Sequence, residues 1–152
     1  MTKPGSATIL VVDDEAPIRL MLQQVLTQEG YDIVTAEDGK EGLDLILKST
    51  PDLILLDLRM PRLDGITFLK AMRTDPKTRS IPVIVLTGLK SRETLEQAME
   101  AGADDFVTKP FETVELKIRI RAMLKLKNIS DELERLQEYI LSMRKERGHA
   151  GD

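Results

Sequence analysis

The chain has 152 residues, of which 41% are hydrophobic and only 3% are aromatic, and its formal net charge is −4 at pH 7. This length and composition suit one domain with a single core and an appendage, and the negative charge argues against direct nucleic-acid binding. The absence of cysteine excludes disulfides and thiolate chemistry. Because the sequence also has no apolar run of signal-peptide or membrane-spanning length, we expect a cytoplasmic protein without membrane contact.

Strand patterns and helix patterns alternate along the chain, after a leader at residues 1–7 that we expect to be flexible. The expected strands are 8–12, 31–36, 53–57, 81–86 and 105–108. A helix is expected after each strand, and these helices start near Pro17, Asp38, Asp64, Ser91 and Glu112. This alternation predicts an α/β fold, with a doubly wound five-stranded parallel sheet and helices on both faces.

The strands of this predicted sheet end in polar side chains. Four apolar residues in a row, typical of a strand buried on both faces, lead directly to Asp57. Asp13 and Asp14 follow the first strand, Thr87 follows the fourth, and Lys109 follows the fifth. Because the carboxyl ends of parallel strands meet at one edge of a sheet, where α/β proteins bind ligands, we expect these side chains to converge.

Converging carboxylates need a counter-charge, because two of them about 4 Å apart repel by roughly 4 kcal/mol at an effective dielectric near 20. Their hard oxygen atoms suit Mg²⁺, which often binds beside a phosphoryl group. The Thr87 hydroxyl can donate to a phosphoryl oxygen, and the Lys109 ammonium can neutralise another. With Asp57 as the nucleophile the product is an aspartyl phosphate, so the sequence predicts a phosphoryl-transfer site.

The motifs that carry these residues resemble the receiver domain of bacterial two-component response regulators. They are Ile9–Glu15, Asp57–Pro61 with Asp64-Gly65, Thr87-Gly88 and Phe106–Phe111. The resemblance covers residues 8–127 and is specific, because separate motifs occur in the family's order on the expected elements. It implies a flavodoxin-like fold with strand order 2-1-3-4-5.

The resemblance also implies roles for individual residues. Asp57 would accept a phosphoryl group from a histidine kinase or a phosphotransfer protein. Asp13, Asp14, Asp57 and the backbone carbonyl of Arg59 would hold Mg²⁺. Lys109 would contact the phosphoryl group, the bond from Lys109 to Pro110 would be cis, and Thr87 and Phe106 would form a switch pair. Such a domain is not a classical enzyme, although it catalyses its own phosphorylation and slow autodephosphorylation.

Two other α/β classes fit the sequence less well. Phosphatases of the haloacid dehalogenase type also form an aspartyl phosphate, but they need a second acid two residues after the nucleophile, where this chain has Arg59. Nucleotide-binding domains would show a glycine-rich phosphate loop, and neither G-x-G-x-x-G nor G-x-x-x-x-G-K-[ST] occurs. Glu15 is expected to have only a local role beside the following helix.

The last helix is expected to continue beyond the receiver domain. No proline or glycine occurs from Glu112 to Arg147. Apolar residues there alternate at spacings of four and three, namely Ala122, Leu126, Ile129, Leu133, Leu136, Ile140 and Met143. This spacing predicts a two-stranded coiled coil over residues 128–147, with a frayed end at 148–152. The alternative is a helix that folds back on its own domain.

In the family, such a helix commonly joins the receiver to an output domain, for example a diguanylate cyclase. We therefore expect either a fragment of a longer regulator or a single-domain regulator that acts through its own dimer. The homodimer would form through the C-terminal helix, and also through the surface of the fourth helix, fifth strand and fifth helix, which phosphorylation would switch. The competing hypothesis is a constitutive dimerisation module with an idle phosphorylation site.

Overall fold

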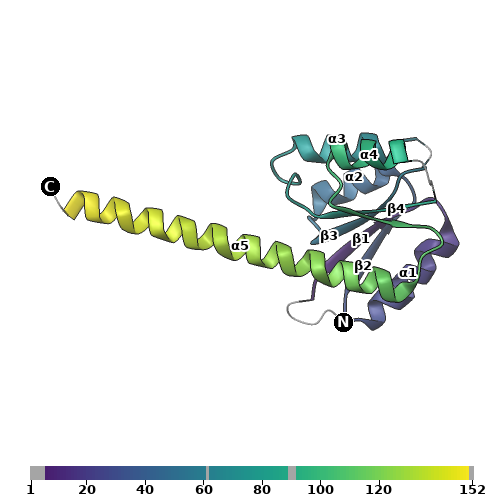
Figure 1. Cartoon of the computed structure of the whole chain (residues 1–152), viewed down its shortest axis with the longest axis horizontal. Helices are drawn as coiled ribbons and strands as arrows, with labels where there is room; N and C mark the ends of the chain where they lie inside the picture. Colours follow the sequence, from purple (N-terminus) through teal and green to yellow (C-terminus); the bar gives the residue numbers. More distant parts are fainter. Residues whose placement is uncertain (1–5, 61, 89–91, 151–152) are drawn as a thin grey trace.

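The computed structural model describes residues 6–60, 62–88 and 92–150 (Figure 1). Its strands are β1 (Thr8–Val12), β2 (Asp32–Ala36), β3 (Leu53–Asp57), β4 (Val83–Thr87) and β5 (Asp105–Thr108). Its helices are α1 (Ala16–Gln28), α2 (Gly39–Lys48), α3 (Gly65–Thr74), α4 (Arg92–Ala101) and α5 (Thr113–Ala150). Most of the predicted leader and the predicted cap Ser91 lie outside the described residues.

All strand pairs are parallel, and the sheet order is β2-β1-β3-β4-β5, which confirms the predicted fold. The central strand β3 is buried along its whole length, as its unbroken apolar run predicted. Helices α1 and α5 cover one face of the sheet, and α2, α3 and α4 cover the other (Figure 1). This arrangement leaves the carboxyl edge of the strands to the connecting loops. None of the helices in the described part combines the length and apolar character needed to cross a bilayer.

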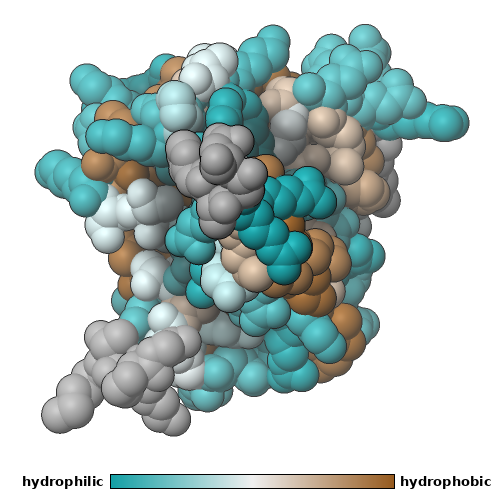
Figure 2. Space-filling model, turned by 90° about the vertical axis from the view of Figure 1, so that its left-hand side faces the viewer, coloured by the Kyte–Doolittle hydropathy of each residue, from teal (hydrophilic) through white to brown (hydrophobic). Residues whose placement is uncertain are grey.

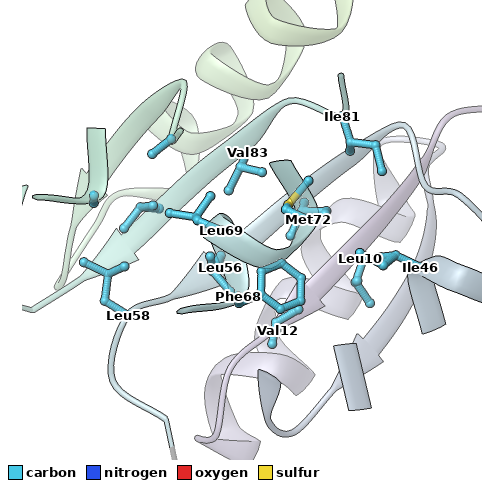
Figure 3. Packing of buried hydrophobic residues seen from close by; sticks show 14 of the residues in the cluster. Leu10, Val12, Ile46, Leu56, Leu58, Phe68, Leu69, Met72, Ile81 and Val83 are labelled. Carbon is cyan, nitrogen blue, oxygen red and sulfur yellow. The ribbon is translucent and has the colours of Figure 1, made fainter. Parts of the chain in front are cut away.

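The larger of the two cores lies between the sheet and helices α2 to α4 (Figure 3). Its largest side chain is Phe68 on α3, which is fully buried and lies beside Val12 and Leu56 of the sheet (Figure 3). Helix α2 approaches this cluster so closely that a Cβ atom on Gly42 would lie 3.0 Å from the Phe68 ring and 3.1 Å from Val12. The close packing fixes both helices, and therefore the loops at the carboxyl edge, relative to β1 and β3.

Two helices on this face begin at an aspartate, as predicted. The Asp38 carboxylate accepts a hydrogen bond from the amide of Glu41 at 2.8 Å and caps α2. The Asp64 carboxylate accepts one from the amide of Thr67, also at 2.8 Å, and caps α3. Each cap satisfies an amide that the helix itself leaves without a partner, and each starts its helix close to the carboxyl edge.

Replacing Asp64 with alanine should lower the free energy of unfolding by about 1 kcal/mol, because the first turn of α3 loses its cap. The measurement is urea unfolding followed by far-UV circular dichroism. Asp44→Ala is the matched control, since Asp44 is exposed in the middle of α2 and its loss should change stability by less than about 0.5 kcal/mol. Equal losses in the two variants would contradict the capping role.

The first half of α5 is fixed to the rest of the chain. Its residues Leu116 and Ile120 are buried against the sheet. A basic stretch on the same half forms ion pairs: Lys117 with Glu29 at 2.9 Å, Arg121 with Glu29 at 3.2 Å, Arg119 with Asp105 at 2.9 Å and Lys127 with Asp52 at 3.6 Å. These pairs form within one chain because α5 lies directly beside acidic residues at the ends of α1, β3 and β5.

The second half of α5 leaves the α/β body as a single projecting helix (Figure 1). Every side chain from 128 to 147 is exposed, so in the isolated chain the helix does not fold back on its own domain. The helix continues to Ala150, three residues beyond Arg147, where the sequence predicted that it would fray. Figure 2, which faces the side toward which α5 projects, shows hydrophobic residues gathered to one side of the centre, beside strongly hydrophilic ones.

Candidate functional site

The polar strand ends meet at the carboxyl edge of the sheet. Asp57 is the last residue of β3, and Asp13 directly follows β1, its neighbour in the sheet. Carboxylate oxygens of Asp13, Asp14, Glu15 and Asp57 all lie within 4.8 Å of one another. Asp13 and Asp57 are buried, whereas Asp14 and Glu15 are exposed. The edge therefore holds an acidic cluster with two buried members and two at its rim.

Lys109 supplies the positive charge within this cluster. Its ammonium nitrogen lies 2.9 Å from Oδ2 of Asp13, 3.2 Å from Oε2 of Glu15 and 3.6 Å from Oδ2 of Asp57. The Lys109 amide donates to the Thr87 carbonyl at 2.8 Å, which extends the pairing of β4 and β5 and directs the side chain across the strand ends. The peptide bond from Lys109 to Pro110 is cis.

Backbone hydrogen bonds fix the two buried carboxylates. Asp13 Oδ1 accepts from the amide of Glu15 at 2.9 Å, and Asp57 Oδ1 accepts from the amide of Arg59 at 3.2 Å. The loop after Asp57 returns so closely that a Cβ atom on Gly65 would lie 2.7 Å from the Asp57 carbonyl oxygen and 2.8 Å from the Cα atom of Leu58. Only glycine fits there, which explains the Asp64-Gly65 pair at the start of α3.

Burial and a like charge together make Asp57 hard to ionise. Loss of solvent raises its pKa from 3.8 to about 6, and the neighbouring Asp13 carboxylate contributes to the same rise, while Lys109 opposes it. For Lys109, burial alone would lower the pKa, but the carboxylates of Asp13, Asp57 and Glu15 outweigh it, so the pKa is raised. With four carboxylates around one ammonium the cluster is net negative, and its hard oxygen donors fit a divalent cation such as Mg²⁺.

The two residues of the expected switch pair differ in exposure. Thr87 ends β4 and is buried, with 1% of its surface exposed. Phe106 on β5 is 37% exposed, which is unusual for an aromatic side chain in a sheet. Its backbone pairs with Val85, two residues before Thr87, so both residues belong to neighbouring strands near the acidic cluster.

Sequence reasoning missed two contacts at this edge. Glu15, which we expected to have only a local role, forms the ion pair with Lys109. Arg62, in the loop between β3 and α3, has a positive φ of 69° and pairs with the capping residue Asp38 at 2.6 Å. The position of Glu15 immediately after Asp13 and Asp14 was a usable signal. The Arg62 contact depends on how two loops approach each other, which no local pattern specifies.

The fold and this site define the class of protein. Residues 9–121 match the response regulator receiver domain, so the chain belongs to that family.

Among its relatives, the response regulator PleD of Caulobacter vibrioides is 46% identical over 129 residues, which cover 84% of this chain and 28% of PleD. The phosphate regulon transcriptional regulatory protein PhoB of Escherichia coli is 45% identical over 117 residues, which cover 77% of this chain and 51% of PhoB. The solved structure of the chemotaxis response regulator CheY4 of Vibrio cholerae has a TM-score of 0.74 and 33% identity, and the match covers 78% of this chain and 98% of that one. The chain therefore spans about half or less of the length of PleD and PhoB.

Proposed function

We propose that Asp57 is a phosphoacceptor, which takes a phosphoryl group from a histidine kinase or a phosphotransfer protein in the cytoplasm, in a reaction that depends on Mg²⁺. The observation that carries this proposal is the contact between a buried carboxylate and a partly buried ammonium, 3.6 Å from Asp57 Oδ2 to Lys109 Nζ, at the carboxyl edge of a receiver fold. An acceptor there is shielded from bulk water, while the loop side of the sheet remains accessible to a donor.

Each residue of the site has a proposed part. A carboxylate oxygen of Asp57 attacks phosphorus, the bond from phosphorus to the donor histidine nitrogen breaks, and the electron pair of that bond stays on the imidazole. Lys109 neutralises charge on the phosphoryl oxygens, and the Thr87 hydroxyl donates to one of them. Asp13, Asp14, Asp57 and the carbonyl of Arg59 would hold Mg²⁺, which supplies further charge neutralisation when bound.

A phosphoryl mimic tests the site directly. With Mg²⁺ and beryllofluoride, the wild-type chain should show a bound fluorine resonance in ¹⁹F NMR, and Asp57→Asn should show none. Asp44→Asn, which removes an exposed carboxylate from α2, should bind as the wild type does. Phosphorylation by a small phosphodonor should likewise add one phosphoryl group to the wild type and none to Asp57→Asn, as read by intact mass. A bound resonance that persists without Asp57 would refute the proposal.

The same proposal includes a switch. Phosphorylation would draw the buried Thr87 toward the phosphoryl group and let the half-exposed Phe106 turn inward. Exposed apolar residues on the two helices of this surface support a role in binding other chains, namely Met99 on α4 and Val114 and Ile118 on α5. A shift from 1:99 to 99:1 needs about 5.5 kcal/mol, which a few charge-assisted hydrogen bonds of roughly 1.5–3 kcal/mol each can provide.

The projecting half of α5 supports a homodimer. The predicted coiled-coil residues between Leu126 and Met143 are 39–58% exposed, although they form a regular apolar stripe that a second copy could bury. We propose that two chains associate along this stripe, with a contribution from the surface of α4, β5 and α5. In longer relatives such a helix could transmit the switch to an output domain.

A constitutive dimer with an idle site is the second candidate. It is favoured by the regular apolar stripe on a continuous helix, because coiled-coil pairing along such a stripe needs no phosphoryl group. Light scattering on a size-exclusion column, with and without Mg²⁺ and beryllofluoride, separates the two. A mass that doubles with the mimic, and does not double in Asp57→Asn, supports the switch, whereas the same dimer in every condition supports constitutive assembly.

A further inference from the structure

Lys109 is shared among three carboxylates that differ in exposure. Asp13 has none of its side chain exposed and Asp57 has 7%, whereas the side chain of Glu15 is 57% exposed. Glu15 also occupies the N-cap position of α1 without making a side-chain cap bond, so its carboxylate is not engaged by the helix. The contact with Lys109, at 3.2 Å, is therefore the interaction that places this side chain.

The ammonium group of Lys109 has three donors: Asp13 and Glu15 each accept a hydrogen bond from it, at 2.9 Å and 3.2 Å, and Asp57 is an ion-pair partner at 3.6 Å, beyond hydrogen-bond distance. To donate to a phosphoryl group on Asp57, the ammonium would have to move toward Asp57 and so weaken its hydrogen bond to Asp13 or the one to Glu15. Loss of the contact between Lys109 and Asp13 would leave a buried carboxylate with one partner fewer, which is costly. Loss of the contact between Lys109 and Glu15 costs little, because the exposed carboxylate of Glu15 is then hydrated instead. Of the three contacts, the one to Glu15 is the exchangeable one.

We propose that Glu15 is a positioning residue: it holds the Lys109 ammonium at the rim of the acidic cluster before phosphorylation and releases it to the incoming phosphoryl group. This inference rests on the proposed phosphoacceptor role of Asp57. It assigns Glu15 opposite effects on two ligands. By drawing Lys109 toward the rim, Glu15 favours a divalent cation among the carboxylates, and by competing for the same ammonium it disfavours a phosphoryl anion.

The test is Glu15→Gln, titrated with Mg²⁺ alone by NMR, and with beryllofluoride at saturating Mg²⁺ by ¹⁹F NMR. Mg²⁺ should bind about two- to fivefold more weakly than in the wild type, and beryllofluoride about two- to fivefold more tightly, since an exposed ion pair has effects of this size. Glu37→Gln is the matched control, because Glu37 is an exposed acid that follows β2 at the same edge of the sheet. It should change both affinities by less than twofold.

A double-mutant cycle shows whether Glu15 acts through Lys109. In the Lys109→Met background, Glu15→Gln should weaken Mg²⁺ binding less than it does in the wild type, because only the loss of a nearby charge remains. An equal loss in both backgrounds, or beryllofluoride affinity that does not rise in Glu15→Gln, would overturn the inference. Neither result would touch the proposed function, which fails only if the wild type does not bind beryllofluoride or if Asp57→Asn still does.

Discussion

Replacing both Leu133 and Leu136 with aspartate should leave the protein monomeric under conditions in which the wild type is a dimer. Each leucine is 54% exposed in the single chain and lies in the middle of the predicted coiled-coil stripe. A dimer would bury four such side chains, and even at about 1 kcal/mol each their loss weakens association by about a thousandfold. Size-exclusion chromatography with light scattering over a range of concentrations measures this change.

The chain offers a matched control on the same projecting half of the helix. Leu141 is 57% exposed but lies outside the stripe, between Ile140 and Met143. Leu141→Asp adds the same kind of charge to the same region and should keep the dimer. If the variant at Leu133 and Leu136 dimerises as tightly as the wild type, the stripe is not the interface. If Leu141→Asp also dissociates the dimer, added charge rather than lost packing is the cause.

The fold could be predicted well because its determinants are local. Unbroken apolar runs such as 53–56 predict strands buried on both faces, and caps such as Asp38 and Asp64 mark where helices start. The order of the strands came from the resemblance to receivers and not from these patterns. The sheet of β2, β1, β3, β4 and β5 confirms it.

The contacts within the site could be predicted from the sequence only in part. The convergence of carboxylates could be expected, since each follows a parallel strand and all parallel strands end at one edge. The position of Glu15 after Asp13 and Asp14 indicated that it lies near the cluster, but its contact with Lys109 depends on how far a flexible lysine side chain reaches between residues 94 positions apart. The ion pairs of Lys117 and Arg121 with Glu29 could not be predicted for a similar reason, because a basic stretch of sequence does not show which acidic residue its helix will contact.

Asp57→Asn should raise the free energy of unfolding at pH 8 by about 1–3 kcal/mol in the absence of Mg²⁺. The shift of the Asp57 pKa from 3.8 to about 6 means that the folded environment disfavours the charged carboxylate, relative to the neutral one, by about 3 kcal/mol. Because the folded-state pKa is the higher one, the folded protein holds this proton more tightly than the unfolded chain does. The contribution to stability is therefore fully present below about pH 4 and is lost as pH rises through about 6.

Urea unfolding of both proteins at several pH values measures the difference, which isolates Asp57 from groups that titrate alike in the two. The advantage of Asp57→Asn should be small near pH 4, grow up to about pH 6 and stay constant above it. Asp44→Asn should show no such trend, because Asp44 is exposed. Adding Mg²⁺ at pH 8 should stabilise the wild type more than Asp57→Asn and so narrow the gap, since a ligand stabilises the state that binds it. If the difference in free energy of unfolding between the two proteins does not change with pH, burial beside Asp13 does not disfavour the charged form of Asp57. The electrostatic reason for a cation in this cluster would then be lost.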